Sequence, residues 1–287
     1  MVLLWATGSA LAGELLIVQS GRDRAAGEIR KSVTRAVAAD TELLLLSDYA
    51  EVDLPRIVRE EQPDLVLTIG EAAFKAARKI RGVPLVAVMA LSLGSGRSIP
   101  ANVTGIDIRI DPIRYMTLFS ALGLKRIGVA YDPAQSGAYL AKAQHAAALT
   151  GIELALRPAK SPREALKSLG SLKGSASDGI WLVPDPTTVT ALTLEANFSL
   201  TLEEKKPIIS YAGEHIRKGA AVTLNPDWAR MGSQTSDMVR KILNGAAPRE
   251  IPPQFPHYVT LGSNENVLKH LGIPSAKLER LFPKTKD

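Results

Sequence analysis

Short runs of Val, Ile and Leu alternate with longer segments of helical period along most of this 287-residue chain, from Leu15 onward. Apolar runs of this kind are typical of strands that are buried on both faces of a parallel sheet. A chain about twice the usual domain length has room for two such sheets, each with its own core. The sequence therefore predicts an α/β protein with two lobes and open, mainly parallel sheets.

The expected elements form two successive series. The first has strands at 15–19, 42–46, 64–69 and 84–89 and helices at 23–38, 54–61 and 70–80. A turn-rich segment at 94–102 and an extended connector at 103–108 follow it. The second has helices at 112–122, 137–150, 162–172 and 188–203 and strands at 126–131, 152–156, 179–183 and 207–210. The tail is expected to form an extended run at 220–224, a helix at 227–244, a strand at 258–261 and a helix at 265–271.

The composition excludes several kinds of chemistry. The chain has no cysteine, which removes disulfides, thiolate catalysis and cysteine-ligated metals. Its 4 histidines are scattered, and no zinc motif such as HExxH occurs. The net charge of +6 is spread over single Lys and Arg residues, without a basic run interleaved with aromatic residues. We therefore expect no metal, no cofactor and no nucleic-acid partner.

The first residues have features of a secretory signal. Residues 2–12 are uncharged and mostly apolar, and they end in Ala10-Leu11-Ala12, a pattern of the kind that signal peptidase cuts. No positively charged region precedes them, so residues 1–12 are interpreted as the remnant of a longer signal peptide. The alternative is a first core strand with an apolar lead-in. Because no cysteine follows the pattern, we expect a periplasmic protein that is not lipid-anchored through cysteine.

The candidate ligand site comes from the strand ends, because ligands of open α/β sheets bind beyond the carboxyl ends of the strands. Helix N-termini at that edge present free N–H groups and a positive dipole end. In the first lobe these positions are Ser20, Gly70, Glu71, Met89 and Ala90. In the second lobe they are Tyr131, Gln135, Ser136, Asp185, Thr187, Thr188 and Tyr211. The expected ligand is a small molecule captured in the cleft between the lobes.

Two kinds of contact are expected from these residues. Backbone N–H groups and the hydroxyls of Ser20, Ser136 and Thr187 would hold a ligand carboxylate, and Asp185 would bind an amino group. The alternative for Asp185 is structural, since Asp-Pro-Thr-Thr is also an ordinary turn with a helix cap.

Other candidate residues also have two interpretations. Glu71 stands at a helix start, where a carboxylate is favourable without any ligand. Tyr131 and Tyr211 would stack on a flat ligand or fill half-buried positions. Tyr115 and Trp181 lie on apolar faces and are expected in the core.

No catalytic constellation is visible in the sequence. Gly94-x-Gly96 lacks the third glycine and the preceding strand of a dinucleotide fingerprint, and nucleophile-elbow and Walker patterns do not occur. Glu71 and Asp185 belong to different lobes, and no histidine is expected at a strand end to pair with them. An enzyme is therefore not expected.

Several segments resemble those of a known family. They are Asn102–Gly105, Lys125–Asp132, Asp178–Thr187, Lys206–Ile209, Lys218–Ala221, Met231–Gly232, Lys241–Gly245 and Leu271–Ile273. Together they resemble the substrate-binding proteins of ABC importers in the type I periplasmic-binding-protein class, in the group with tryptophan- and tyrosine-binding members. They cover most of the chain from Leu15 onward in the right order.

The resemblance implies two Rossmann-like lobes joined by three crossings, near Ile106, Asn225 and Pro256. The implied N-terminal lobe is 13–107 plus 226–256, and the C-terminal lobe is 108–225 plus 257–287. Where the family usually has a Thr-Asp-Pro-like loop, this chain has the apolar Met89–Leu93. An aromatic amino acid is therefore not carried over as the ligand.

These observations predict a periplasmic solute receptor that works with the membrane permease of an ABC importer. Its ligand class would be an amino acid or a related carboxylate or aromatic compound, and the expected state is a monomer. The alternative is a ligand sensor coupled to a membrane kinase or chemoreceptor, because the same fold serves both roles.

Overall fold

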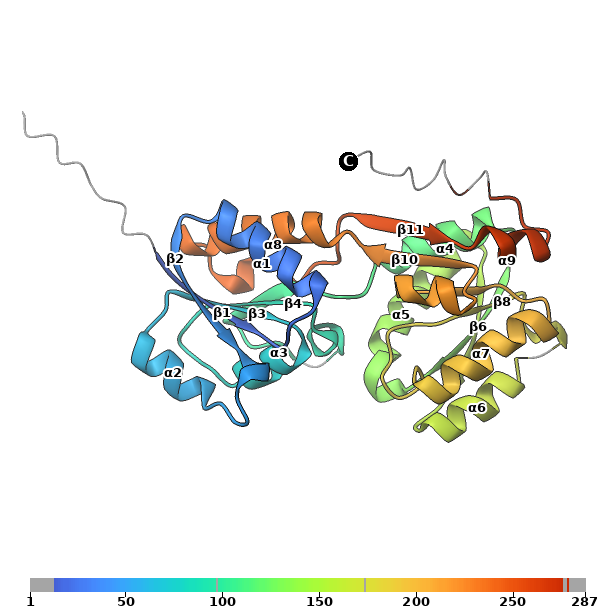
Figure 1. Ribbon diagram of the computed structural model, residues 1–287, viewed down its shortest axis with the longest axis horizontal. Coiled ribbons are helices and arrows are strands. Elements are labelled where there is room, and N and C mark those ends of the chain that lie inside the picture. Colours follow the sequence, from blue (N-terminus) through green and yellow to red (C-terminus); the bar gives the residue numbers. More distant parts are fainter. Residues whose placement is uncertain (1–12, 97, 173, 276–277, 279–287) are drawn as a thin grey trace, which may run out of the picture. The chain divides into compact units, whose positions relative to one another are not determined.

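A computed structural model describes residues 13–96, 98–172, 174–275 and 278 (Figure 1). The expected signal segment, 1–12, lies outside these residues. The described chain divides into two compact units, and contacts group the residues as follows. The first unit is 13–89, 100–105 and 232–252, and the second is 90–99, 106–231 and the residues from 253 onward. Apart from segment 90–99, the chain passes between the units after Gly105, Met231 and Pro252.

The first unit is built on a five-stranded sheet with the order β2-β1-β3-β4-β5. Its strands are β1 (Gly13–Gln19), β2 (Ala39–Leu45), β3 (Leu65–Ile69), β4 (Leu85–Val88) and β5 (Val103–Ile106). The pairs β1/β2, β1/β3 and β3/β4 are parallel. All residues of β3 and β4 are buried, as the uninterrupted apolar runs predicted. The expected connector is the edge strand β5 of this sheet.

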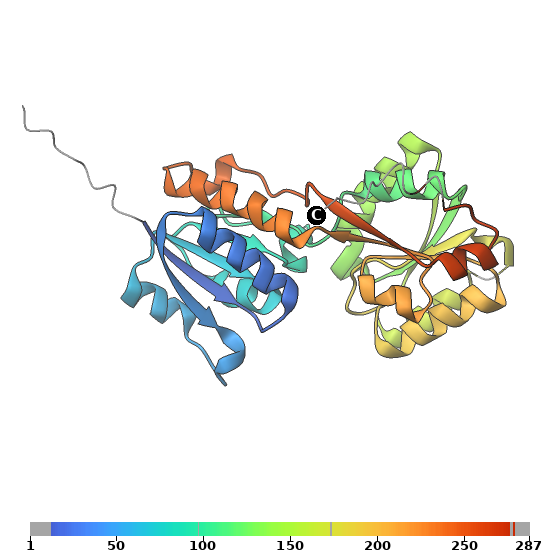
Figure 2. The same cartoon turned by 45° about the horizontal axis from the view of Figure 1, so that its top comes forward.

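Helices cover both faces of this sheet. They are α1 (Arg24–Ala36), α2 (Leu54–Glu61), α3 (Glu71–Ala77) and α8 (Trp228–Leu243), of which α8 enters the unit at Gly232. Figures 1 and 2 show α1 and α8 side by side on one face, whereas α2 and α3 lie on the other. Short 3-10 turns follow β2 at η1 (Leu46–Asp48) and precede the last crossing at η5 (Pro248–Glu250).

The contact between α1 and α8 requires a glycine at position 232. A Cβ there would lie 2.5 Å from Ser32 Cβ and 3.2 Å from Ile29 Cα. Gly232→Ala should therefore lower the free energy of unfolding by about 1–3 kcal/mol, because the helices must separate. Gly27→Ala is the control, since a Cβ at Gly27 meets nothing within 4 Å and alanine favours the helix. Urea denaturation measures both; equal effects of the two substitutions would contradict the tight crossing.

The second unit has a six-stranded sheet with the order β11-β10-β9-β8-β6-β7. Its strands are β6 (Arg126–Tyr131), β7 (Glu153–Pro158), β8 (Gly179–Trp181), β9 (Ile208–Ser210), β10 (Val222–Pro226) and β11 (Val259–Ser263). Neighbouring strands are parallel except β10 and β11, which are antiparallel. Its helices are α4 (Pro112–Ala121), α5 (Pro133–Thr150), α6 (Pro162–Gly170), α7 (Ala191–Glu203) and α9 (Glu265–His270), with 3-10 turns η2 (Leu91–Gly94), η3 (Gly174–Ala176) and η4 (Gly213–Lys218).

The two faces of this sheet carry separate cores. Trp181 of β8 is 1% exposed and packs with Tyr115, Phe119 and Tyr139 from α4 and α5. Its neighbour Ile180 points to the other face, into a cluster with residues of α6 and α7. Successive residues of one strand thus belong to different cores, as the alternation of side chains along a strand requires. The prediction that Tyr115 and Trp181 are core residues is confirmed.

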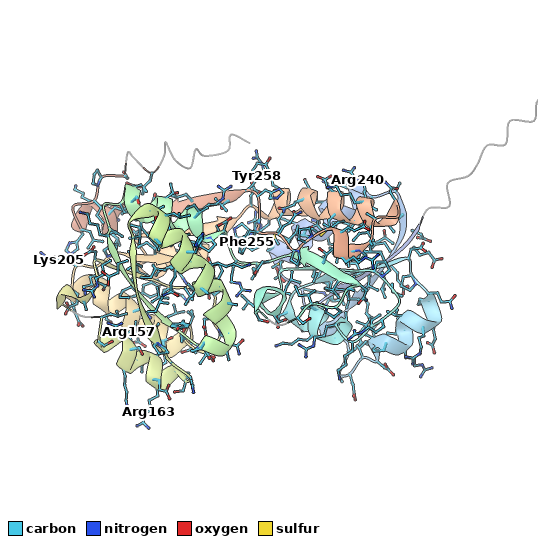
Figure 3. All side chains as sticks on the ribbon, turned by 180° about the vertical axis from the view of Figure 1, so that it is seen from behind. Arg157, Arg163, Lys205, Arg240, Phe255 and Tyr258 are labelled. Carbon is cyan, nitrogen blue, oxygen red and sulfur yellow. The ribbon has the colours of Figure 1, made fainter. Side chains whose placement is uncertain are left out.

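The C-terminal segment is held to this unit by aromatic contacts. Phe255 packs edge-on against Tyr139, with 6.3 Å between ring centroids, and Lys142 Nζ lies 5.4 Å from the Phe255 ring. Tyr258 follows three residues after Phe255, and Arg230 lies over its ring, with 4.6 Å between the guanidinium carbon and the ring centroid. Both aromatic residues, labelled in Figure 3, follow the last crossing into this unit after Pro252. Phe255 and Tyr258 therefore anchor the start of the C-terminal segment to this unit.

Segment 90–99 lies with the second unit, whereas sequence reasoning assigned it to the first lobe. Two contacts explain the difference. Leu91 O accepts a hydrogen bond of 2.8 Å from Arg109 Nη2, and Gly96 lies so close to α5 that an added Cβ would be 2.7 Å from Ala138 Cβ. Neither contact follows from the apolar character of Met89–Leu93, which gives no signal for the surface on which the segment packs.

Candidate functional site

In the first unit, the ends of three strands meet at one edge of the sheet. Ser20 follows β1, and its N–H donates to Ile69 O at the end of β3 (2.9 Å). Gly70 follows β3, and its N–H donates to Val88 O at the end of β4 (2.9 Å). Ser20 Oγ accepts a hydrogen bond from the N–H of Ala73 in the first turn of α3 (2.9 Å). The structure therefore brings the predicted residues Ser20 and Gly70 together. The hydroxyl of Ser20 already accepts a hydrogen bond from the first turn of α3.

Gly70 and Met89 have unusual backbone conformations at this edge. Gly70 has φ +98°, and a Cβ there would lie 2.5 Å from Ser20 Oγ, so that only glycine fits. Met89 follows β4 with φ +58°, a conformation that L-residues rarely adopt. Strained conformations of this kind cost about 1–3 kcal/mol and gather at ligand sites.

The remaining predicted residues near this edge have other contacts. Glu71 forms an ion pair with Lys75 one turn further along α3, at 3.1 Å. Ala90 is fully buried and belongs to the segment that packs on the second unit. Its side chain is therefore part of a core, and Glu71 has the role that its position in a helix favours without a ligand.

In the second unit, Asp132 and Asp185 form the centre of a buried polar cluster at the carboxyl ends of β6 and β8. Asp185 Oδ2 accepts a bond from the Asp132 N–H (2.8 Å), and Oδ1 accepts bonds from the N–H groups of Thr187 (3.0 Å) and Thr188 (3.2 Å). Asp132 Oδ2 in turn accepts a bond from Thr187 Oγ1 (2.8 Å). The structure thus brings Asp185, Thr187 and Thr188 together around Asp132.

The geometry gives Asp185 a structural role. Three of the approximately four positions at which a carboxylate accepts hydrogen bonds are taken by backbone N–H groups. Its side chain is 2% exposed, and the bonds hold the turn after β8 against the start of α5. Binding of a ligand amino group by Asp185 stays a prediction that this arrangement does not favour.

The first turn of α5 carries two further predicted residues. Gln135 is exposed, whereas Ser136 is fully buried and its Oγ has no hydrogen-bond partner among the described residues. A buried hydroxyl without a partner costs free energy, but a side chain without exposed surface is out of reach of a ligand in this conformation, so contact with Ser136 stays a prediction.

Tyr131 and Tyr211 are half-buried at the ends of β6 and β9. Burial, aided by the charges of Glu214 and Asp185, raises the pKa of Tyr211 to about 12. Tyr211 packs edge-on against His215, with 5.6 Å between ring centroids. Half-burial fits both alternatives for each tyrosine, a stacking surface or a structural plug.

His215 lies beside a strand end, where sequence reasoning expected no histidine. Its Nδ1 is 2.7 Å from the hydroxyl of Ser210, the last residue of β9, and both residues are buried. Sequence reasoning missed the pair because the 3-10 turn η4 brings His215 back over the strand. Nδ1 is occupied by a serine instead of the carboxylate that orients a catalytic histidine, so the pair has the character of a core contact.

The stability of the protein should depend on pH through His215. Burial lowers the pKa of His215 below its ordinary 6.5, Glu214 opposes the shift and Lys218 adds to it. Below pH 6.5 the unfolded chain therefore takes up the proton more readily, and stability should fall until the folded-state pKa is passed. Melting temperatures between pH 7.5 and 5 should show a steeper fall for the wild type than for His215→Gln. Parallel curves would contradict this assignment.

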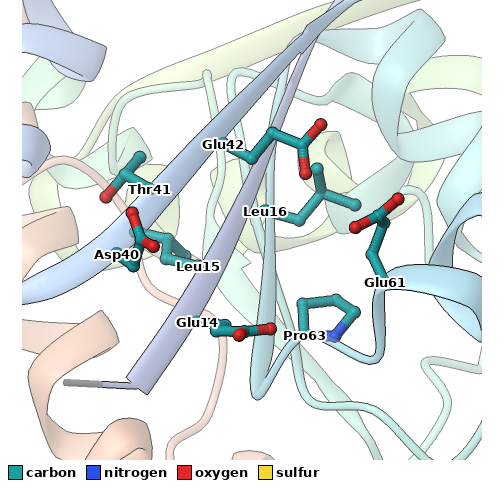
Figure 4. A pocket seen from close by; sticks show the side chains of 8 residues that line it. All are labelled: Glu14, Leu15, Leu16, Asp40, Thr41, Glu42, Glu61 and Pro63. Atoms are coloured by element: carbon teal, nitrogen blue, oxygen red, sulfur yellow. The ribbon is translucent and has the colours of Figure 1, made fainter. Parts of the chain in front are cut away.

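A separate pocket lies at the opposite, amino-terminal edge of the first sheet (Figure 4). It measures about 330 Å³ and carries the carboxylates of Glu14, Asp40, Glu42 and Glu61. Within the described residues, no group of three or more His, Asp or Glu side chains is arranged to hold a metal ion. This acidic pocket is far from the strand ends at which a parallel sheet binds ligands, so it is not the candidate site.

The protein has two α/β units, each with hydroxyls and helix starts gathered at the carboxyl edge of its sheet, and the chain passes between the units at three main places. These features define a bilobal solute-binding fold of the type I class. Solved structures share it. One is a substrate-binding protein with adhesive properties from Clostridium difficile, solved ligand-free and open (TM-score 0.70, 20% identity, 92% of this chain and 96% of that one). A second is a conserved domain protein from Vibrio cholerae O1 biovar El Tor (TM-score 0.64, 21% identity, 94% of this chain and 98% of that one). A third is an ABC domain in complex with L-Trp from Streptococcus pneumoniae (TM-score 0.65, 19% identity, 93% of this chain and 98% of that one).

The family model for ABC transporter substrate binding proteins matches residues 48–280. The chain belongs to this family, which confirms the resemblance drawn from the sequence. Membership implies a small-molecule ligand and a transporter partner, and the family consists of solute-binding proteins and not of enzymes. No curated protein matches the sequence. Among the described residues, no helix combines the length and apolar character needed to cross a membrane.

Proposed function

We propose that this protein is the solute receptor of an ABC importer and that its ligand is an amino acid or a related carboxylate or aromatic compound. The family match over residues 48–280 carries the proposal. The similar structure from Streptococcus pneumoniae, which is in complex with L-Trp, supports an amino acid as the ligand class. Because the apolar segment Met89–Leu93 replaces the loop that the family usually has, the proposal does not specify the side chain of that ligand.

In this proposal each unit contributes strand-end groups to the ligand. The first unit offers the edge at Ser20 and Gly70 and the strained backbone of Met89. The second offers the exposed Gln135 and the half-buried rings of Tyr131 and Tyr211. The hydroxyls and free N–H groups suit a carboxylate, and the rings suit an apolar or flat side chain.

Ligand binding can be tested by thermal shift and calorimetry with the twenty amino acids, beginning with L-tryptophan. A ligand at 100 times its dissociation constant should stabilise the protein by about 2.7 kcal/mol. Tyr211→Ala should weaken binding of the compound that stabilises the wild type, whereas Leu149→Ala, at an exposed position outside the predicted site, should not. Consumption of the bound compound, or equal effects of both substitutions, would contradict the proposal.

We also propose a periplasmic location, with residues 1–12 as part of a removed signal. The observation in favour is the apolar, small-residue pattern of these residues, together with a family of receptors that are typically extracytoplasmic. N-terminal sequencing of the protein from a periplasmic fraction should begin after Ala12. A mature chain that retains Val2 would exclude this cleavage.

A further inference from the structure

The strand β2 forms one edge of the first sheet, and its outer side has no partner strand. Its pairing with β1 runs without a bulge from Ala39 to Leu45. Apart from the turn η1 at its end, no backbone hydrogen bond joins β2 to any described segment other than β1. None of its residues is buried. The outer side of β2 therefore presents a row of free N–H and C=O groups.

The other edge strands of the two sheets are better protected than β2. Proteins protect sheet edges with short strands, charged side chains, proline or bulges, or cover them. The edge strand β5 has 4 residues and is buried throughout, and β7 contains Arg157 and ends in Pro158. The third, β11, has 5 residues, including Gly262, which weakens a strand. With 7 residues β2 is the longest of these edges, and its second half has none of these protective features.

The second half of β2 carries an apolar run on this free edge. Leucine occupies every position from Leu43 to Leu46. Leu43 is 44% exposed, the other three leucines are half-buried, and Tyr49 just beyond the run is 57% exposed. An unbroken apolar run is typical of a strand that is covered on both faces, as β3 and β4 are. The leucines of β2 therefore indicate a cover that the described part of a single chain does not supply.

A second copy of β2 fits this edge in one orientation, which charge selects. The first half of the strand carries Asp40 and Glu42, and both line the acidic pocket of Figure 4. A parallel, in-register pair would set each carboxylate beside its own copy, which is destabilising. An antiparallel pair centred on Leu44 instead places Leu43 opposite Leu45 and moves the acidic halves to opposite ends. The leucine run is thus complementary to itself.

We propose that the protein forms a homodimer in which the β2 strands of two copies pair antiparallel about a two-fold axis at Leu44. The two first-unit sheets then form one continuous sheet, and the free N–H and C=O groups of each edge are satisfied by the other. Because a two-fold contact uses the same surface on both copies, the assembly closes at two chains. This state differs from the monomer expected from the sequence. It goes beyond the proposed function and does not rest on it.

Cysteine cross-linking tests the register directly, because the chain has no cysteine and an introduced thiol is the only one. Residues opposite each other in an antiparallel pair have Cα atoms about 4.5–5.5 Å apart, within the range of a disulfide. Under mild oxidation Leu44→Cys should therefore form a disulfide-linked dimer about tenfold faster, or more, than the control Leu149→Cys. Leu149 is 72% exposed and lies in the second unit. Equal rates for the two variants would overturn the proposal.

Analytical ultracentrifugation tests the association itself. The wild type should change from monomer to dimer as its concentration rises. Leu43→Lys should weaken this association by about tenfold or more, because lysine on an edge strand opposes pairing. Leu149→Lys places the same charge on an exposed leucine of the second unit and should leave it unchanged. Equal melting temperatures of the two variants at low concentration show that Leu43→Lys is folded.

The outcomes separate this dimer from other uses of the edge. A wild type that stays monomeric up to about 1 mM, the weak end of specific association, would overturn the proposal, even if the edge bound a membrane or another protein. A dimer that persists unchanged in Leu43→Lys would also overturn it, because the contact would then lie elsewhere. Loss of the dimer in Leu43→Lys alone supports it. Ligand binding by thermal shift is a separate measurement, so failure of the proposed function would leave this result standing.

Discussion

Arg109→Met is expected to lower the free energy of unfolding by about 3–5 kcal/mol, because it leaves the buried carboxylate of Asp107 without its counter-charge. Arg109 is 1% exposed. Its Nε lies 2.9 Å from Asp107 Oδ1, and its Nη2 lies 2.9 Å from Asp107 Oδ2. Nη2 also holds Leu91 O, and the guanidinium lies 5.2 Å from the centroid of the Tyr139 ring. The substitution would therefore also release segment 90–99 from the second unit.

The double variant Arg109→Met/Asp107→Leu should recover most of this loss, because no buried charge remains. Arg126→Met is the control: its ion pair with Glu153 is exposed, and loss of such a pair costs about 0–1 kcal/mol. Urea denaturation of the four proteins measures these differences. If the double variant were no more stable than Arg109→Met, packing of the arginine and not charge would explain the effect.

The cost of Arg109→Met should also depend on pH. Burial raises the pKa of Asp107, and Arg109 opposes this shift. Without Arg109 the folded-state pKa rises further, so the folded protein holds its proton at higher pH than the unfolded chain does. The loss of stability caused by the substitution should therefore be smallest near pH 4 and grow as the pH rises toward the folded-state pKa. A loss that is independent of pH would contradict this assignment.

Gly105→Ala is expected to have an effect of similar size on the first unit, of about 3 kcal/mol or more. A Cβ at Gly105 would lie 1.8 Å from Ala87 O and 2.7 Å from Ala87 C. Both are backbone atoms of the central part of β4, which cannot rotate away as a side chain can. The edge strand β5 would therefore have to separate from the sheet at the point where the chain leaves this unit.

Gly21→Ala is the matched control for Gly105→Ala, since a Cβ at Gly21 meets nothing within 4 Å. Hydrogen exchange of the amides of β4 and β5, together with urea denaturation, measures the damage. Exchange should become faster at Leu85, whose N–H donates to Asn102 O. A Gly105→Ala protein as stable as Gly21→Ala would show that β5 can shift without cost.

Much of the fold could be predicted because the strands are apolar runs and the helices begin with clear signals. The predicted ranges 54–61 and 126–131 agree with α2 and β6. In contrast, α5 begins at Pro133, four residues before its predicted start, because Asp132 caps it and Pro133 occupies the first turn. Met231, Met238 and Ile242 of α8 are buried, but the close fit of Gly232 against α1 leaves no pattern in the sequence.

The candidate site could be predicted only in part. The position of a residue at the end of a strand shows that it lies at the carboxyl edge of the sheet, but it does not show which groups its side chain contacts. The cluster around Asp132 depends on contacts between residues 53 positions apart, such as the Asp132 N–H and Asp185. Asp132-Pro133 after a strand was a usable signal for a capping residue.

The order in which the protein is synthesised bears on how it can assemble. The first unit lacks the α8 layer over its sheet until residues 232–252 are made, and the second lacks the antiparallel partner of β10 until β11 is made. Neither core can be completed on the ribosome before most of the chain has emerged, so each partial unit exposes apolar surface during translation. Release of a chain that stops before α8 should yield a species bound by chaperones, even though its first 106 residues contain all five strands of one sheet.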